Sequence, residues 1–157
     1  MPATLPSTSA SHYLTGTAAL SIPDETGEAA DWHFDEAFLR EGTRYRVAGV
    51  NFPATSHLLG DDGIRECSAI MRKRAVPLPP GQPFYAANFA RSVLDVLLAT
   101  TEKHQRPDFL NAAEILSPDD FGEVVDKLAR VRSRITDTLQ LNLIDEWIAA
   151  QTQNANT

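Results

Sequence analysis

The strongest hydrophobic pattern in the chain lies at residues 84–104, where apolar side chains recur on more than one side of a 3.6-residue helix. A helix that is wetted on one side keeps a single apolar stripe, so this pattern predicts a helix that is covered on most of its surface. Polar residues, Arg91 and Asp95 among them, interrupt the segment, and it is too short to span a bilayer. We therefore expect residues 84–104 to form the core helix of a soluble domain.

Short strand patterns precede this helix. Small and β-branched residues at 15–22 and alternating residues at 45–50 are typical of strands, and a short return strand is expected at 31–34 after a turn. One helical turn is expected at 35–40. Because the connections look too short for crossover helices, we expect these strands to form a small antiparallel sheet.

A second helix is predicted over residues 61–74, after Gly60. Asp61 is its expected N-cap, Cys67 lies on its apolar face, and its last turn is basic, as the helix dipole favours. Four prolines in residues 76–83 then predict an extended connector rather than a regular element.

The clearest local signal marks the start of another helix at Ser117. Ser117 suits the N-cap, Pro118 suits the first helical position, and two acidic residues follow in the first turn. Apolar residues then recur at helical spacing as far as Ile135. A break with a new cap is expected at 136–138, and a last helix follows it.

Length and composition indicate one domain. A chain of 157 residues can bury a core without disulfides, and fractions of 43% hydrophobic and 22% charged residues are ordinary for a globular protein. We expect a single α+β domain over residues 14–150, with a small N-terminal antiparallel sheet packed on about four helices. The polar ends, residues 1–13 and 151–157, are expected to be flexible tails.

The excess of acidic residues limits the kinds of partner that the protein can bind. A formal net charge of −7 argues against nucleic acid as the main partner, because phosphate neutralisation needs a surplus of lysine and arginine. It suits a soluble enzyme, or a protein that covers a basic partner. The single cysteine allows no internal disulfide, and the N-terminus lacks a basic region followed by an apolar core. We expect a cytoplasmic protein without a membrane partner.

Two histidines next to acidic residues are the candidate chemical groups. On a strand, Asp31, His33 and Asp35 would share one polar face, which indicates either a solvated face or a binding surface. Asn51 and His57 flank a Phe-Pro pair and are expected near the end of the sheet, where both could line one pocket. These five residues are our candidate partner-binding set.

Motifs of well-understood catalytic mechanism are missing from the sequence. It contains no glycine-rich phosphate loop, nucleophile elbow or HExxH motif. Cys67 is expected to be a small buried hydrophobe, and we expect no catalytic residue, no metal and no cofactor. An alternative is a small hydrolase-like enzyme that uses His33 or His57 with a nearby aspartate. A further alternative is a phage or mobile-element accessory protein with a structural role.

Several short segments carry a family resemblance: residues 16–23 (GTAALSIP), 31–34 (DWHF), 56–60 (SHLLG) and 65–68 (RECS). Together they resemble small bacterial antitoxin-like proteins encoded beside nucleotidyltransferase toxins of the abortive-infection type, over roughly residues 14–150. The resemblance implies a partner that neutralises such a toxin by direct contact in phage defence. It transfers no catalytic residue. Because no clear helix-turn-helix is present, DNA binding for autoregulation is in doubt, and the oligomeric state is left open.

Overall fold

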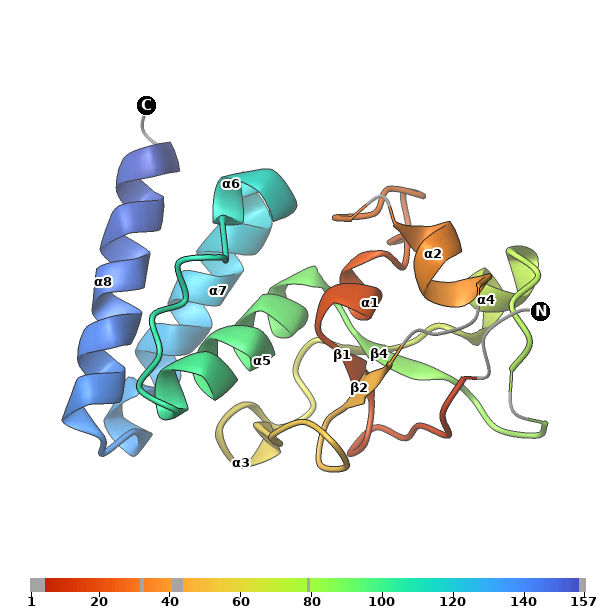
Figure 1. The fold of residues 1–157 in the computed structure, drawn as a ribbon, viewed down its shortest axis with the longest axis horizontal. Helices are drawn as coiled ribbons and strands as arrows, with labels where there is room; N and C mark the ends of the chain where they lie inside the picture. The colour runs from red at the N-terminus through yellow and green to blue at the C-terminus, as the bar shows by residue number, and fades with distance from the viewer. Residues whose placement is uncertain (1–4, 32, 41–43, 79, 156–157) are drawn as a thin grey trace.

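The computed structural model describes residues 5–31, 33–40, 44–78 and 80–155. In chain order the elements are β1 (Leu14–Thr15), α1 (Thr17–Leu20), α2 (Phe34–Phe38), β2 (Arg46–Val47), α3 (Ser56–Leu59), β3 (Ile64–Glu66), α4 (Ser68–Lys73), β4 (Tyr85–Ala87), α5 (Phe89–Glu102), α6 (Ala112–Ile115), α7 (Pro118–Val131), a 3-10 turn η1 (Arg132–Arg134) and α8 (Thr138–Ala155). The helices α6, α7 and α8 lie at one end, the sheet with α1, α2 and α4 lies at the other, and α5 runs between them (Figure 1). The α+β fold class expected from the sequence is confirmed.

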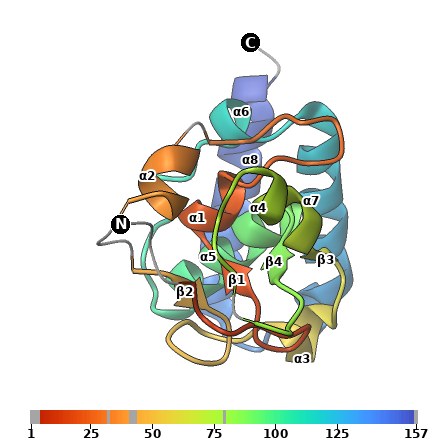
Figure 2. The same cartoon turned by 90° about the vertical axis from the view of Figure 1, so that its right-hand side faces the viewer.

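The sheet is mixed rather than antiparallel. Its strand order is β2-β1-β4-β3, and these strands lie side by side in Figure 2. Both outer pairings are antiparallel, but β1 and β4 pair in parallel, with Leu14 opposite Ala86. The expectation of a wholly antiparallel sheet is therefore wrong for the central pair. The long segment between β1 and β4 contains α1 to α4 and makes the crossover that a parallel pairing requires.

The core helix is confirmed, but it begins later than the hydrophobic pattern suggested. Residues 85–87 pair with strands β1 and β3, and α5 starts after Asn88, whose side chain accepts a hydrogen bond from Arg91 N at 2.8 Å. An asparagine at this position satisfies one of the free N–H groups of the first turn, so it sets the boundary. Residues 90–99 are all buried. The helix packs against α7 and α8 on one side and α1 and the sheet on the other, which explains why its apolar side chains face several directions.

Two of the expected strands are wrong. Of the segment 15–22 only Thr15 belongs to β1, which begins at Leu14. Gly16 takes a φ of 77° and turns the chain into α1 at 17–20, where two alanines favour a helix. The strand expected at 31–34 is wrong as well, because His33 takes the N-cap position and Phe34 is already the first residue of α2. Trp32 lies outside the described residues. The expected helical turn at 35–40 corresponds to α2 and is confirmed.

The helix predicted at 61–74 is also wrong in its first half. Gly60 and Gly63 have φ angles of 60° and 81°, which stop α3 and reverse the chain into strand β3. Asp61 therefore caps no helix. The helical part is α4, which begins after Cys67 and keeps the expected basic last turn.

The C-terminal helices follow the capping signals. Asp120 N donates to Ser117 Oγ at 3.1 Å, with Pro118 in the first turn of α7, so the predicted cap is confirmed. Asp137 caps α8 by accepting from Leu139 N and Gln140 N. The short helix α6 lies between α5 and α7. None of the helices in the described part of the chain has the length and apolar character that crossing a membrane needs.

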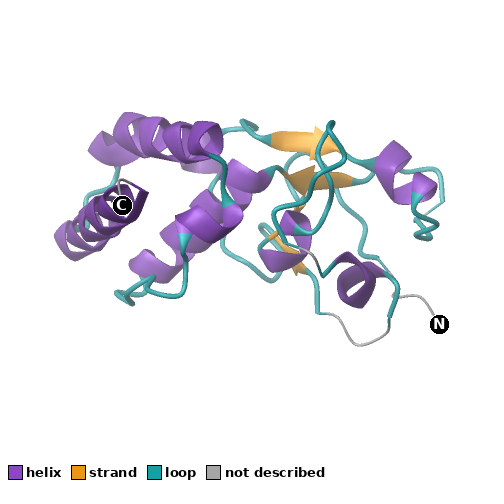
Figure 3. Cartoon of the chain, turned by 90° about the horizontal axis from the view of Figure 1, so that it is seen from above, coloured by secondary structure: helices purple, strands orange, loops and turns teal. Residues whose placement is uncertain are grey.

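Both ends of the domain extend beyond the expected limits of 14 and 150. Leu5 and Tyr13 are buried, and Tyr85 N in β4 donates to Thr8 Oγ1 at 2.8 Å. At the other end α8 continues to Ala155, and the buried Gln151 accepts from Ala112 N at 2.9 Å. In the view of Figure 3, the helix that ends at the C-terminus lies on one side of the molecule and the strands lie on the other side.

Candidate functional site

The net charge of the chain is concentrated in one stretch, residues 24–36, which we call the acidic segment. It contains six carboxylates and no lysine or arginine: Asp24, Glu25, Glu28, Asp31, Asp35 and Glu36. The other 15 acidic residues are almost balanced by the 14 lysines and arginines. Nearly all of the formal charge of −7 therefore belongs to this segment.

The fold holds the start and the middle of the acidic segment in place. The guanidinium of Arg65 in β3 donates to the carbonyl oxygens of Ile22 and Pro23 at 2.8 and 2.6 Å. Asp31 N donates to Leu20 O in α1 at 2.9 Å. Residues 24–31 thus form a loop that is tied to the sheet and to α1.

A local turn keeps its first carboxylate ionised. Asp24 Oδ1 accepts from the hydroxyl and the N–H of Thr26 at 2.6 and 2.9 Å and from Glu28 N at 3.2 Å. The hydroxyl of Thr26 is the largest of the influences that hold the pKa of Asp24 below its usual value. This carboxylate therefore stays negative at neutral pH.

The structure brings Asp31 and His33 together, as their proximity in sequence suggested. Asp31 Oδ1 accepts from His33 N at 3.0 Å and also contacts His33 Nδ1, so these two contacts hold the pair together. The side chain of His33 is 47% exposed and that of Asp31 only 18%. Asp35 lies in the first turn of α2, where its charge faces the positive end of the helix.

His33 lines an open hollow of about 310 Å³ between α1, α2 and β2, which we call the His33 pocket. Its polar lining includes Thr17, Ser21, His33, Glu36, Arg44 and Arg46. The lining therefore combines the end of the acidic segment with two arginines. A hollow of this size and polarity suits a charged side chain or a small polar ligand.

The other two candidate residues lie elsewhere. Asn51 Oδ1 accepts from Val47 N at 2.7 Å, and its Nδ2 donates to Tyr45 O at 2.8 Å, so Asn51 holds a turn after β2. His57 is exposed in α3 and lines a hollow of about 270 Å³, whereas Asn51 lines a different one. Both hollows border on Pro53, but the expected common pocket is absent among the described residues.

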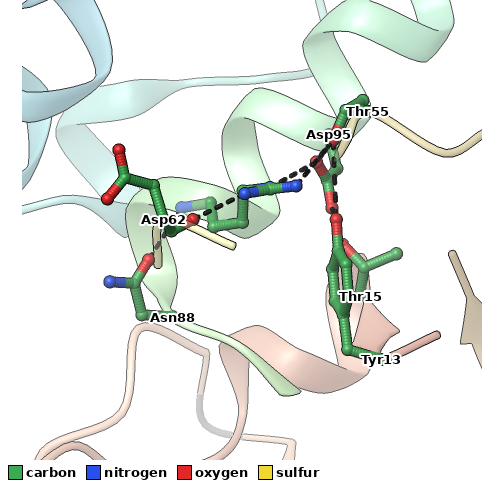
Figure 4. A network of polar contacts seen from close by, with 7 residues as sticks. Tyr13, Thr15, Thr55, Asp62, Asn88 and Asp95 are labelled. Carbon is green, nitrogen blue, oxygen red and sulfur yellow. Dashed lines mark hydrogen bonds and ion pairs between the residues drawn. The ribbon is translucent and has the colours of Figure 1, made fainter. Parts of the chain in front are cut away.

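A buried network of polar side chains was missed by the sequence reasoning. Arg91 and Asp95 on α5 are both fully buried, and Arg91 Nε donates to Asp95 Oδ1 at 3.1 Å. Tyr13 and Thr15 donate to the other oxygen of Asp95 at 2.7 and 2.8 Å, and Thr55 Oγ1 donates to Oδ1 at 2.6 Å (Figure 4). The signal that could have found this pair is its i, i+4 spacing of opposite charges in a helix predicted to be covered all round.

The two terminal nitrogens of the Arg91 guanidinium also donate hydrogen bonds. Arg91 donates to Asp62 O at 2.6 Å and to Thr55 Oγ1 at 3.1 Å, and its Cζ lies 5.2 Å from the centre of the Tyr13 ring. Because both charges are enclosed and hydrogen-bonded, this network is a structural joint between α5, β1 and the loops around α3 rather than a reactive site.

The position of the single cysteine makes its thiol unreactive. Cys67 is buried, and this burial raises the pKa of its thiol to about 11. The expectation that it is a buried hydrophobe is confirmed. Among the described residues, no group of three histidine, cysteine, aspartate or glutamate side chains is placed to hold a metal ion.

No family model, curated protein or solved structure matches the chain. Its function must therefore be argued from the acidic segment and from the hollows of the surface.

Proposed function

We propose that this protein acts by binding, and that the acidic segment docks on a basic surface of a protein partner. The observation that carries the proposal is the concentration of nearly all the net charge in residues 24–36. Opposite charges on two proteins speed their encounter and fix their relative orientation.

The segment presents its carboxylates to solvent from a supported base. Glu25, Glu28, Asp35 and Glu36 are exposed. Beneath them the buried ring of Phe34 packs against Phe38 at 5.0 Å between ring centres. Preorganised charges lose little entropy on binding, so a fixed acidic face favours association.

The partner we propose is a nucleotidyltransferase-type toxin, which the chain would neutralise as an antitoxin-like protein. Enzymes that transfer nucleotides surround the phosphates with cationic groups. The acidic segment has the charge to occupy such a cleft, and the resemblance in residues 16–23, 31–34, 56–60 and 65–68 supports this class of partner.

Co-expression with a toxin of the nucleotidyltransferase type tests the proposal. The wild-type chain is expected to restore growth, and Glu28→Lys with Asp35→Lys should reduce the rescue. The matched control reverses two exposed carboxylates outside the segment, Glu114→Lys and Asp126→Lys, and should rescue fully. Failure of the wild type to rescue, or equal effects of the two double variants, would contradict the proposal.

A second candidate function is hydrolysis with His33 as a general base. The contact between Asp31 and His33 Nδ1 at the edge of a pocket that also contains Ser21 favours it, because an aspartate can orient a histidine for proton transfer. His33→Gln separates the two functions, since it leaves the six carboxylates unchanged. If the protein acts by binding, His33→Gln should reduce the rescue less than the double charge reversal does, because it removes a single contact. If the protein is a hydrolase that uses His33 as its base, His33→Gln should abolish its activity.

A further inference from the structure

A second hollow opens between the last turn of α5 and the segment after β2, and we call it the Phe109 pocket. Its volume is about 360 Å³, within the range of small-molecule sites, and none of residues 24–36 lines it. The lining residues that matter here are Arg46, Asn51, Phe52, Lys103, Gln105 and Phe109. It shares Arg46 with the His33 pocket.

The charge of this pocket is opposite to that of the chain. Its lining contains Arg46 and Lys103 and no aspartate or glutamate, although the formal net charge is −7. Neither cation forms an ion pair within the described part of the chain, whereas two other exposed arginines, Arg106 and Arg132, are paired with carboxylates. Two unneutralised cations at one hollow favour an anionic ligand.

Aromatic faces complete the pocket. The side chain of Phe109 is 67% exposed, one of the most exposed large hydrophobic residues in the described chain. Phe52 lies under the guanidinium of Arg46, with 5.4 Å from Cζ to the ring centre. An exposed phenylalanine gains by stacking on a planar ring, which would cover its apolar face.

The C-terminal end of α5 lies at the pocket and would repel an anion, but hydrogen bonds at this end weaken the repulsion. The C-terminal carbonyl groups of a helix carry partial negative charge. Here Thr100 O and Thr101 O accept from Gln105 N and His104 N at 3.2 and 2.9 Å, and Lys103 follows in the same turn. The partial charge is therefore partly satisfied, and the cations decide the sign of the pocket.

We propose that the Phe109 pocket binds a free mononucleotide, with its base against Phe109 and its phosphate beside Arg46 and Lys103. The side-chain amide of Gln105 makes no hydrogen bond in the described structure, so it is available to the edge of the base. A nucleic acid strand offers the same ring and phosphate, but the acidity of the chain disfavours a polyanion. The proposal goes beyond the protein contact made by the acidic segment and does not depend on it.

Titration calorimetry of the full chain with AMP tests the proposal, with Phe109→Ala and Lys103→Gln as variants. Val50→Ala and Lys73→Gln are matched controls, since both residues are exposed and lie outside the pocket. Loss of a stacking aromatic should weaken AMP binding by at least about fivefold, and the controls should bind like the wild type. Thermal unfolding of each variant verifies that it is folded.

Adenosine, inorganic phosphate and a short single-stranded oligonucleotide identify the part of the ligand that is recognised. Lys103→Gln should weaken AMP but leave adenosine unchanged, and phosphate alone should bind less tightly than AMP. The proposal is overturned if AMP does not bind, if Phe109→Ala binds it as well as the wild type, or if phosphate alone binds equally well. Much tighter binding of the oligonucleotide would show that the ligand is a nucleic acid strand.

Discussion

Arg91 and Asp95 form an ion pair with no exposure to solvent, one helical turn apart on the core helix, with 3.1 Å from Nε to Oδ1. Two charges are costly to bury, and hydrogen bonds to the remaining atoms are needed to offset that cost. Tyr13, Thr15 and Thr55 supply them to Asp95. The pair therefore ties segments that are far apart in sequence to one helix.

Removal of one partner of this pair should be strongly destabilising. Asp95→Ala leaves the guanidinium of Arg91 buried without its counter-charge, and the free energy of unfolding should fall by about 3–5 kcal/mol. Urea denaturation measures the change. The double variant Arg91→Met with Asp95→Leu should lose less than the sum of the single variants. A loss below about 1 kcal/mol for Asp95→Ala would show that the network is not a joint of the fold.

Because of Tyr13, the stability of the folded protein should depend on pH in the alkaline range. Burial, with a further contribution from the charge of Asp95, raises its pKa from 10.0 to about 12. The folded state thus holds the phenol proton more tightly than the unfolded state. The resulting stability is complete below pH 10 and is lost as the pH rises through about 12.

This dependence can be measured by following the free energy of unfolding against pH. Tyr13→Phe has no phenol at this site, so its stability should decline less over the same interval. A decline of the same size in both proteins would assign the effect to other groups.

The predictable parts of the fold were those with strong local signals. Ser117 and Pro118 marked the start of α7, because an N-cap and a first-turn proline act within one turn of the chain. The core helix was found because its apolar residues face several neighbours. Its start was missed, since the role of Asn88 as a cap depends on residues 85–87 being in a sheet.

The missed parts depended on backbone angles or long-range contacts. A φ of 77° at Gly16 and one of 81° at Gly63 redirect the chain, and sequence patterns do not reveal these angles. Of the candidate site, the proximity of Asp31 and His33 was predictable from their spacing. The separation of Asn51 from His57 follows from the tertiary fold and was not.

Loss of the N-cap of α7 should lower the stability of the protein moderately. Ser117→Ala should lower the free energy of unfolding by about 1 kcal/mol, because Asp120 N loses its hydrogen-bond partner while Pro118 still supports the first turn. Thermal or urea denaturation checks it. Ser133→Ala is the control and should change little, because Ser133 is exposed in η1 and its side chain makes no hydrogen bond to the described residues.

Cys67 should react slowly with alkylating reagents in the folded protein. The buried thiol has a pKa of about 11, so very little thiolate is present at neutral pH, and access is blocked as well. Mass spectrometry of timed samples gives the rate, and labelling in urea gives the rate of the exposed thiol. Equal rates in the two conditions would contradict the buried position.

The measurement that tests the binding account most directly is the association rate constant with the proposed partner, a toxin of the nucleotidyltransferase type, followed by stopped-flow at several salt concentrations. We predict that Glu25→Gln, Glu28→Gln and Asp35→Asn together lower this rate constant at low salt by about tenfold and reduce its dependence on salt. The control removes the same number of charges outside the acidic segment, with Glu102→Gln, Glu114→Gln and Asp126→Asn, and should stay close to the wild type. Equal slowing by the two triple variants, or the absence of any complex, would contradict the account.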